Sequence, residues 1–471
     1  METALISFSY SFIRIYVRIS KHYAMKCIRL TAFCLLLLLA EASAQTFTRN
    51  TIISANDLSF LEGMTRDVME ASRIYPGQFI SKDIGSNHTG GTLIRPGGRN
   101  AYPSFWIRDY AMSLETGMVS NEEQLHMLLL TASTQCDQSW ITNGGSLVPA
   151  GAIADHIRID DSKPIYFPGT YSYEGQGTPE WGMLSPYCDQ FYFVHMAYYY
   201  VKHTGDLNIL LKEVNGTRLF DRLKTAFHTP PSNTNNHIVY ATDAIRGVDF
   251  GFRDVITITG NLCLTSILKY RAANELAELL QLAGRKKEAD VYQQIAASIK
   301  KVLPDLFMDD RGMLLASTGK SKQPDVWGTA LAVYFGILDG EYLKKASTVL
   351  ANAYKAGTLS YRGNIRHILT MDDFNETTAW DVSLAAKNKY QNGAYWGTPT
   401  GWVCYAIYQT DPHSATALFN EFIEDLKTND YRKGGGFGAP YECFNKSGYT
   451  QNPIYLTTVA CPLVALRKMM K

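Results

Sequence analysis

The sequence predicts an all-α fold in which paired helices form an (α/α)6 toroid, and three observations support this prediction. From Leu58 onward, stretches with apolar residues three and four positions apart alternate with loops rich in Gly, Pro and Asn. Strand-like alternation of apolar and polar residues is scarce. The candidate helices number about a dozen, which suits a double ring of inner and outer helices.

The clearest helix pair lies in the middle of the chain. Apolar residues recur at helical spacing from Asn261 to Leu282 and again from Arg285 to Val302, with Ala283-Gly284 between them. A short turn between two such patterns is typical of an α-hairpin. The same reasoning predicts further helices at Ile107 to Val119, Glu122 to Ser133, Gln190 to His203, Asp206 to Phe227, Val326 to Ile337, Glu341 to Tyr354, Thr400 to Tyr408, Ser414 to Lys427 and Leu456 to Met469.

The chain divides into a short leader and one large domain. In residues 1–44, basic residues precede the apolar run Leu35 to Ala40, and Ala42-Ser43-Ala44 ends it with small residues, as in a signal peptide. We expect cleavage after this run, secretion or export to the periplasm, and residues 1–24 as an extension from an upstream start codon. The apolar run is too short for a membrane span, so we expect no stable membrane insertion after cleavage. Residues 45–471, which no linker or short repeat interrupts, are predicted to form a single (α/α)6 domain.

Composition excludes several kinds of partner. The 45 basic and 44 acidic side chains nearly cancel, so we expect no binding to nucleic acid. None of the 10 histidines lies at a metal-ligand spacing and no C-x-x-C pair occurs, so we expect neither a metal site nor a cofactor. The cysteines are too scattered for their disulfide pairing to be assigned. Aromatic residues form 12% of the chain, which suits stacking against sugars, although most will pack the core.

Long loops rich in Trp, Tyr, Asp, Glu and Gly separate the predicted helices. Loops of this length in a compact domain are usually functional. In a ring of alternating inner and outer helices, every second connection emerges on the same face, so we expect these loops to meet around one pocket. They are Gly85 to Arg108, Gly144 to Asp189, Ala241 to Gly260, Thr370 to Gly401 and Asp430 to Pro453.

Each of these loops, with its flanks, offers a carboxylic acid. Hydrolysis of an acetal needs one acid to protonate the departing oxygen, and an inverting enzyme needs a second carboxylate to activate water from the opposite side. The candidates are Asp109, Asp155, Glu180, Asp189, Asp249, Asp254, Asp372, Asp373, Glu376 and Glu442.

Two stretches in a fixed order select among these acids. The first is Val248-Asp249-Phe250-Gly251-Phe252-Arg253-Asp254, just before the Asn261 helix pair, and the second is Tyr441-Glu442-Cys443-Phe444-Asn445. Together they resemble the six-hairpin (α/α)6-barrel glycoside hydrolases, particularly the trehalase and processing α-glucosidase group. The resemblance implies Asp249 as the general acid, with Asp254 as a rival, and Glu442 as the general base. Asp249 could instead pair with Arg253.

Two further stretches extend the resemblance from about Trp106 to Pro462. The aromatic segment Tyr395 to Trp402 resembles the loop that forms the bottom of the first sugar-binding site, although its tryptophans could equally pack in the core. The Trp-Ile-Arg-Asp segment at Trp106 resembles a motif that clamps sugar hydroxyls. Strict trehalase signatures are absent, and the insertion from Gly144 to Asp189 has no counterpart. The substrate-binding residues that we expect are Trp106, Arg108, Asp109, Asp189, Arg253, Tyr395, Trp396, Trp402 and Tyr441.

The sequence therefore predicts an exported glycosidase, inverting and exo-acting on oligosaccharides or glycan side chains. Two alternatives stay open. A polysaccharide lyase or unsaturated-uronide hydrolase of the same fold would use Arg108, Arg158 and Arg253 to bind a uronate carboxylate. A glycan-binding protein without catalysis would use the aromatic loops only as a platform. Neither the sugar, its linkage and anomeric configuration, nor the oligomeric state follows from the sequence.

Overall fold

The structure, a computed structural model, describes residues 52–98 and 102–471. Residues Ile52–Lys471 form one compact unit. The expected signal peptide and upstream extension, residues 1–44, lie outside the described residues. Within the two described ranges, no helix combines the length and the apolar character that crossing a bilayer requires.

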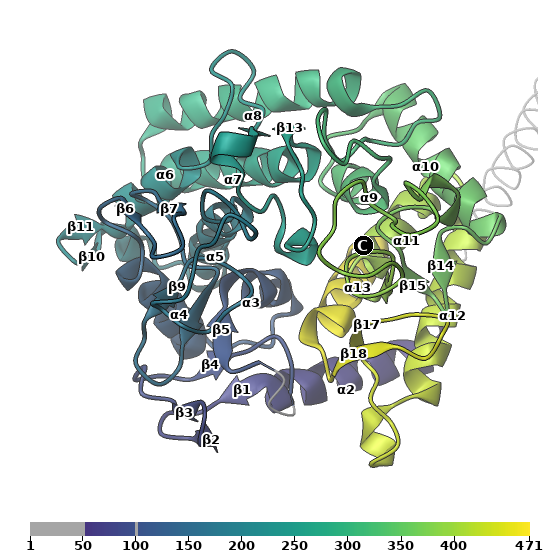
Figure 1. The fold of residues 1–471 in the computed structure, drawn as a ribbon, viewed down its shortest axis with the longest axis horizontal. Helices are drawn as coiled ribbons and strands as arrows, with labels where there is room; N and C mark the ends of the chain where they lie inside the picture. The colour runs from purple at the N-terminus through teal and green to yellow at the C-terminus, as the bar shows by residue number, and fades with distance from the viewer. Residues whose placement is uncertain (1–51, 99–101) are drawn as a thin grey trace, which may run out of the picture. The chain divides into compact units, whose positions relative to one another are not determined.

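The unit is mainly helical, and its helices lie around a common centre (Figure 1). They alternate between two sets along the chain, the odd-numbered helices forming the inner set and the even-numbered ones the outer set. The helices are α2 (Ala55–Ser72), α3 (Ile107–Ser113), α4 (Asn121–Ser133), α5 (Cys188–Thr204), α6 (Leu219–His228), α7 (Cys263–Leu282), α8 (Lys286–Phe307), α9 (Val326–Tyr334), α10 (Gly340–Lys355), α11 (Thr400–Tyr408), α12 (Pro412–Thr428) and α13 (Leu456–Met469).

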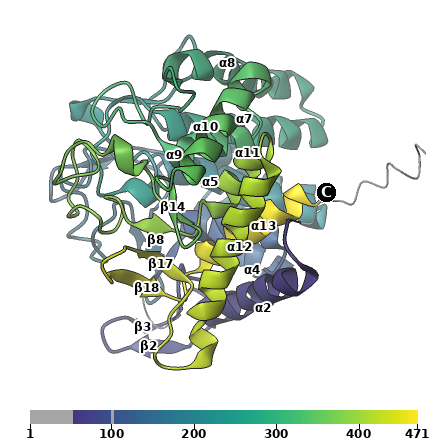
Figure 2. The ribbon, with the colours of Figure 1, turned by 90° about the vertical axis from the view of Figure 1, so that its right-hand side faces the viewer.

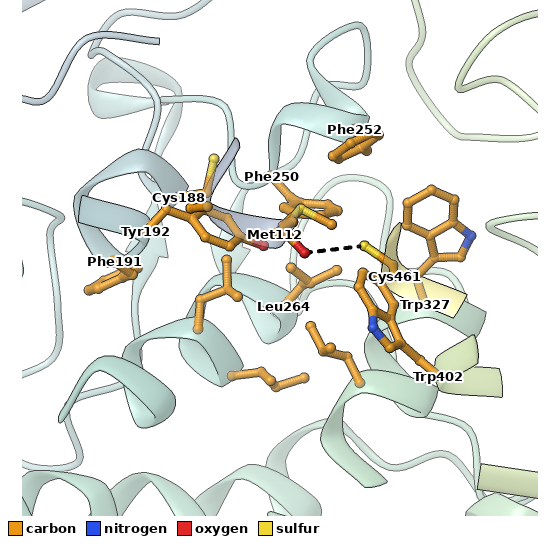
Figure 3. Close-up of a cluster of buried hydrophobic side chains, with 14 of the residues drawn as sticks. Met112, Cys188, Phe191, Tyr192, Phe250, Phe252, Leu264, Trp327, Trp402 and Cys461 are labelled. Atoms are coloured by element: carbon orange, nitrogen blue, oxygen red, sulfur yellow. Dashed lines mark hydrogen bonds between the residues drawn. The ribbon is translucent and has the colours of Figure 1, made fainter. Parts of the chain in front are cut away.

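The inner helices form a closed circuit. Helix α3 packs against α5, α5 against α7, α7 against α9, α9 against α11, α11 against α13, and α13 returns to α3. Each outer helix packs against an inner one, as α8 does against α7 and α12 against α11. Figure 3 shows the apolar cluster at the centre, to which every inner helix contributes. Its labelled members on these helices are Met112, Cys188, Phe191, Tyr192, Leu264, Trp327, Trp402 and Cys461.

Burial along each helix follows its place in the two sets. Every residue of α9 is buried, as expected for a helix covered on all sides. The outer helix α8 buries one face only, including Tyr292, Ile299 and Phe307. Local sequence sets the ends: Ser120 and Glu123 form a capping box at the start of α4, and Gly284, with φ 74°, allows the turn between α7 and α8.

The predicted helix from Asp206 to Phe227 is wrong. The structure has a 3-10 helix, Leu207–Leu211, a hairpin of β10 (Glu213–Val214) and β11 (Thr217–Arg218), and only then α6. The hairpin turn is Asn215-Gly216, and both residues have positive φ (49° and 75°). Asn-Gly favours this left-handed turn, which interrupts a helix. The first helix, α2, is absent from the predictions, although Ser54 caps its start.

Small antiparallel sheets, which the sequence did not predict, fill the long connections. One has the order β5 (Ser104–Trp106), β8 (His156–Arg158), β9 (Pro164–Ile165). A larger one has the order β14 (Ser360–Tyr361), β15 (Asn364–Ile365), β16 (Tyr395–Trp396), β17 (Tyr441–Phe444), β18 (Thr450–Pro453). Two-stranded pairs are β1 (Arg73–Ile74) with β4 (Leu93–Ile94), β2 (Phe79–Ser81) with β3 (Gly85–Ser86), β6 (Trp140–Ile141) with β7 (Leu147–Val148), and β12 (Tyr240–Ala241) with β13 (Gly260–Asn261).

The two ends of the helical ring differ. Figure 2 shows β8, β14, β17 and β18 at one end and the C-terminus at the other. We call the first the loop end, because the connections from outer to inner helices lie there, such as residues 134–187 between α4 and α5. We call the second the turn end, because inner helices connect there to the following outer helices by shorter segments, such as residues 283–285 and 409–411.

Candidate active site

A cavity of about 400 Å³ lies at the loop end. This volume falls within the range of roughly 300 to 1,000 Å³ that is typical of small-molecule sites. All five predicted loops contribute side chains to it, so the prediction that they meet around one pocket is confirmed. Its aromatic wall consists of Tyr102, Trp106, Tyr171, Trp181, Phe252, Tyr390 and Tyr455, and its acidic side chains are Asp109, Asp155, Asp254 and Glu442.

Glu442 is held on β17, between β16 and β18, and is 1% exposed. Its Oε2 atom accepts hydrogen bonds from the Tyr102 hydroxyl at 2.7 Å and from Asn452 Nδ2 at 2.6 Å. Burial raises the pKa of Glu442 to about 8, with the charges of Asp109 and Asp254 adding to the rise and the two donors opposing it. The negative charge of Asp254, which lines the same cavity, thus disfavours ionisation of Glu442.

Asp254 follows directly on a short 3-10 helix, Gly251–Arg253. Its Oδ1 atom is buried and has no hydrogen-bond partner among the described residues. Burial raises the pKa of Asp254 to about 7, the Arg108 guanidinium opposes the rise, and the charge of Asp155 adds to it. A carboxyl group in this setting is partly protonated at neutral pH, as general acid catalysis requires.

Arg108 is the centre of a buried ion cluster beside the two acids. Its Nη1 atom lies 2.7 Å from Asp155 Oδ1 and 3.3 Å from Asp189 Oδ1, and its Nε atom lies 3.7 Å from Asp109 Oδ2. Burial opposes ionisation of Asp155, but Arg108 and His156 hold its pKa below the usual value. A Cβ atom on Gly251 would lie 1.9 Å from Arg108 Cζ, so only glycine fits there. The Arg108 guanidinium is thus surrounded by the carboxylates of Asp109, Asp155 and Asp189.

Asp109 faces the cavity from the start of α3. The Tyr455 hydroxyl donates to its Oδ1 at 2.7 Å. Burial raises the pKa of Asp109 to about 6, against the effects of Arg108 and of the Tyr455 hydrogen bond. Asp109 thus offers hydrogen-bond acceptors to a polar ligand in the cavity.

His156 lines the cavity although it was not among the predicted site residues. Its Nδ1 atom donates to Asp155 Oδ2 at 2.8 Å, and its ring stacks on Trp106 with centroids 4.4 Å apart. Its Nε2 atom is buried without a partner among the described residues. Register explains the placement, because Trp106 pairs with His156 across β5 and β8.

Asp249 does not line the cavity. Its side chain forms an ion pair with Arg253, which also pairs with Asp325 at 2.6 Å. All three side chains are buried. Burial raises the pKa of Asp249, and Arg253 opposes the rise. The structure thus gives Asp249 the structural ion pair that the sequence left open as its alternative role, and Arg253 does not reach the cavity either.

The aromatic segment at Tyr395 also lies outside the cavity. Trp396 is fully buried, and its ring packs edge-on against Phe252 with centroids 5.6 Å apart. It therefore supports the cavity wall from behind. Trp402 packs on Trp327 in the central cluster, so Trp396 and Trp402 both play the core role left open for these tryptophans. Tyr395 is buried, and its ring lies 5.6 Å from that of Tyr361.

The other predicted residues divide in the same way. Trp106, Arg108 and Asp109 line the cavity, whereas Asp189 reaches it only through Arg108. Tyr441 precedes Glu442 on β17 and does not line the cavity, because neighbouring strand residues point to opposite faces. Lining residues that the sequence analysis did not select include Tyr102, Tyr171, Tyr390, Asn452 and Tyr455.

In residues 52–98 and 102–471, no group of three or more His, Cys, Asp and Glu side chains is placed to hold a metal ion. The six cysteines in these residues are buried free thiols, namely Cys136, Cys188, Cys263, Cys404, Cys443 and Cys461.

Comparison with known proteins gives a likeness of fold. No family model and no curated protein matches the sequence. The chain is similar to a rhamnosidase from Klebsiella oxytoca with rhamnose bound (TM-score 0.52, 10% identity), covering 88% of this chain and 64% of that one. It is also similar to an α-L-rhamnosidase from Aspergillus terreus (0.51, 12%), covering 87% and 39%. A protein named only as a glycosidase matches with 0.51 and 11%, covering 89% and 99%.

The chain therefore spans less than two thirds of the length of both rhamnosidases. At these identities the likeness concerns the fold alone. The chain has a mainly helical fold shared with known glycosidases.

Proposed function

We propose that this chain is a glycoside hydrolase with an (α/α)6 barrel, inverting and exo-acting, in which Asp254 is the general acid and Glu442 the general base. The observation that carries the proposal is that two carboxyl groups with raised pKa, from distant loops, line one cavity together with aromatic rings. The closed circuit of inner helices and the fold shared with rhamnosidases support it.

The acid role moves from Asp249 to Asp254. Asp249 is locked in the ion pair with Arg253 and cannot reach a substrate in the cavity. Asp254 lies five positions further along the same motif and does line the cavity. A group that protonates the leaving oxygen must come within hydrogen-bond reach of it, and this requirement favours Asp254.

The hydrogen bonds around the two acids differ. The Tyr102 hydroxyl and Asn452 Nδ2 both donate to Glu442 Oε2, which stabilises the ionised form that a base needs. Asp254 Oδ1 has no hydrogen-bond donor among the described residues, but the Gln391 side chain and the Val255 backbone N–H lower the pKa of this carboxyl, which at about 7 lies below the value of about 8 for Glu442. The division of roles therefore follows the resemblance, which implies Glu442 as the base. Because both pKa values lie near neutrality, the pair holds a proton at neutral pH even while one member is ionised.

The proposed reaction adds water across the glycosidic bond. Asp254 gives its proton to the departing oxygen as the bond to the anomeric carbon breaks. Glu442 takes a proton from a water molecule, whose oxygen bonds to the anomeric carbon from the opposite face. The products are an alcohol and a free sugar of inverted configuration, with Asp254 ionised and Glu442 protonated. Proton exchange with solvent restores the starting state.

The charges of the cavity favour a neutral sugar. Arg108 is its one cationic side chain among the described residues, and Asp155, Asp189 and Asp109 already surround it. Arg158 and Arg253, the other residues considered for a uronate carboxylate, do not line the cavity. A uronate would also face several carboxylates, so the lyase and uronide-hydrolase alternatives receive little support.

The cavity also supports exo action, because five loops wall a volume suited to a single chain end. Export through residues 1–44 remains part of the proposal. The trehalase and processing α-glucosidase grouping remains a prediction.

The first experiment is a panel of nitrophenyl glycosides, beginning with α-L-rhamnoside because the similar structures include rhamnosidases. Proton NMR of the early product would read its anomeric configuration, and we expect inversion. Release of a product with retained configuration would contradict the mechanism. Oligosaccharide binding without turnover would favour the glycan-binding alternative, and an ultraviolet-absorbing product from acidic polysaccharides would favour a lyase.

A second experiment separates the two roles. A dinitrophenyl leaving group needs no proton, so Asp254→Asn should keep much of its activity on dinitrophenyl glycosides while losing activity on alkyl glycosides. Glu442→Gln should lose activity on both, because water activation is needed in either case. The reverse pattern would exchange the roles of Asp254 and Glu442.

A further inference from the structure

A second groove adjoins the cavity at the loop end. Its volume is about 540 Å³, and it shares Tyr171 with the cavity. Its polar lining comes from three places: the turn between β2 and β3, the β5–β8 pair, and the segment after Tyr171. The side chains that matter here are Asp83, Ser104, Arg158, Asp160, Tyr171 and Ser172.

The β5–β8 pair connects the two hollows. Trp106 lies opposite His156, and Ser104 lies opposite Arg158. Residues two apart on a strand point to the same face and lie about 6.6 to 6.8 Å apart. The first cross-strand pair lines the cavity and the second lines the groove. The same face of the β5–β8 pair therefore borders both hollows.

Tyr171 stands between the two hollows. Its side chain is 46% exposed, and its ring lies edge-on to Trp106 and His156, with centroid distances of 5.8 Å and 5.5 Å. An exposed aromatic ring that borders both hollows offers an apolar surface to sugars on either side of it.

The groove lining is chemically suited to hydroxyl groups. Arg158 pairs with Asp160 and, at 3.2 Å, with Asp161, so its charge is balanced while its side chain keeps 29% exposure. Asp83 and Ser172 are exposed and add a carboxylate and a hydroxyl. Carboxylate, guanidinium and hydroxyl groups together provide both donors and acceptors, which a neutral sugar needs.

We propose that this groove binds the sugar residue on the leaving side of the scissile bond. The natural substrates are then neutral glycans whose terminal sugar is linked to a second sugar. This inference rests on the proposed function, because the cavity must bind the terminal sugar for the groove to bind the next one.

The test compares two substrates of the sugar that the nitrophenyl panel identifies. Its glycosyl fluoride fills only the cavity, whereas its disaccharide also reaches the groove. We expect Arg158→Ala to lower the ratio of kcat/KM on the disaccharide to kcat/KM on the fluoride at least tenfold. Asp83→Trp, which narrows the groove from an exposed turn, should lower the same ratio. Lys163→Ala, a neighbouring exposed position outside the groove, is the matched control and should leave the ratio unchanged. An unchanged ratio in both groove variants would overturn the proposal.

Failure of the proposed function would show separately, as no turnover of either substrate by the wild-type chain. Binding to an array of neutral glycans then tests the groove without catalysis. Stronger binding of disaccharide than of monosaccharide conjugates, lost in Arg158→Ala, would support the groove. Equal binding of both conjugates would overturn it.

Discussion

The loop end and the turn end of the helical ring each carry a cavity, and the larger one is at the turn end. That cavity measures about 750 Å³, against about 400 Å³ at the loop end. At the turn end both acids that line the cavity are paired with Arg271, Glu275 at 2.9 Å and Glu115 at 3.1 Å. At the loop end, two acids have pKa values raised to about 7 and 8. Incompletely paired acids therefore mark the candidate site better than volume does.

Connection length explains this difference. At the turn end, three residues join α7 to α8 and three join α11 to α12 (residues 283–285 and 409–411). Such turns only reverse the chain. At the loop end, residues 134–187 and 429–455 are long enough to fold back over the ring and to bring side chains such as Asp155 and Glu442 to one cavity.

The largest expected effect is on turnover. Glu442→Gln and Asp254→Asn should each reduce kcat on a glycoside with a poor leaving group by about 10²- to 10⁴-fold, because each removes a proton-transfer group. Glu115→Gln is the matched substitution at the turn end and should change kcat less than about twofold. Steady-state kinetics on the three variants would check this. A comparable loss of kcat in Glu115→Gln would contradict the assignment of the active site to the loop end.

Stability should respond in opposite directions at the two ends. The folded-state pKa of Glu442 is raised to about 8, so its charged form costs stability as the pH rises from about 4.5 towards 8. Glu442→Gln should therefore gain up to about 4 kcal/mol over the wild type between pH 5 and pH 8. Urea unfolding at the two pH values measures the difference, and a pH-independent difference would contradict it.

The matched variant Glu115→Gln has the opposite sign. Burial opposes ionisation of Glu115, but Arg271 holds its pKa below the usual value. Its contribution is present above the unfolded pKa and is lost only as the pH falls through the folded one. Because the side chain is 41% exposed, the variant should lose less than about 1 kcal/mol, equally at pH 5 and pH 8.

Asp249 belongs to a loop-end connection, residues 229–262 between α6 and α7. Like the acids of the turn-end cavity, however, it forms an ion pair with an arginine, Arg253. Asp249→Asn should lower the free energy of unfolding by about 2 to 3 kcal/mol, because Arg253 loses one of its two buried carboxylate partners. The folded fraction should keep its activity within about tenfold of the wild type. If Asp249→Asn stayed stable, kept its activity on dinitrophenyl glycosides and lost it on alkyl glycosides, Asp249 would be the general acid.

The smallest expected effect is a shift in pH dependence. The Tyr102 hydroxyl lowers the pKa of Glu442 by donating to it, so Tyr102→Phe should raise that pKa by about 0.5 to 1 unit. If Glu442 is the base, the acidic limb of the kcat/KM profile moves to higher pH. A shift of the alkaline limb instead would identify Glu442 as the acid.

Most of the helices could be predicted from the sequence, because the spacing of apolar residues is local, whereas α2 and the hairpin before α6 were missed. The meeting of the loops followed from the alternation of inner and outer helices. Helix α11 begins and ends where the pattern places it, at Thr400 and Tyr408. The choice between Asp249 and Asp254 could not be made, because a 3-10 helix between them turns one towards Arg253 and the other towards the cavity. The place of His156 at the cavity also depends on more than local spacing, since it is set by a strand pairing with Trp106, 50 positions away.

The closed circuit of inner helices has a consequence for biosynthesis. The packing around α3 is complete only when α13 contacts it. More than 300 residues separate the two helices in the chain. At about 5 to 20 residues per second, the ribosome needs on the order of 15 to 70 seconds to make that stretch. During this time the apolar flank of α3 lacks its final neighbour, which makes the nascent chain a client for chaperones until synthesis passes Leu456.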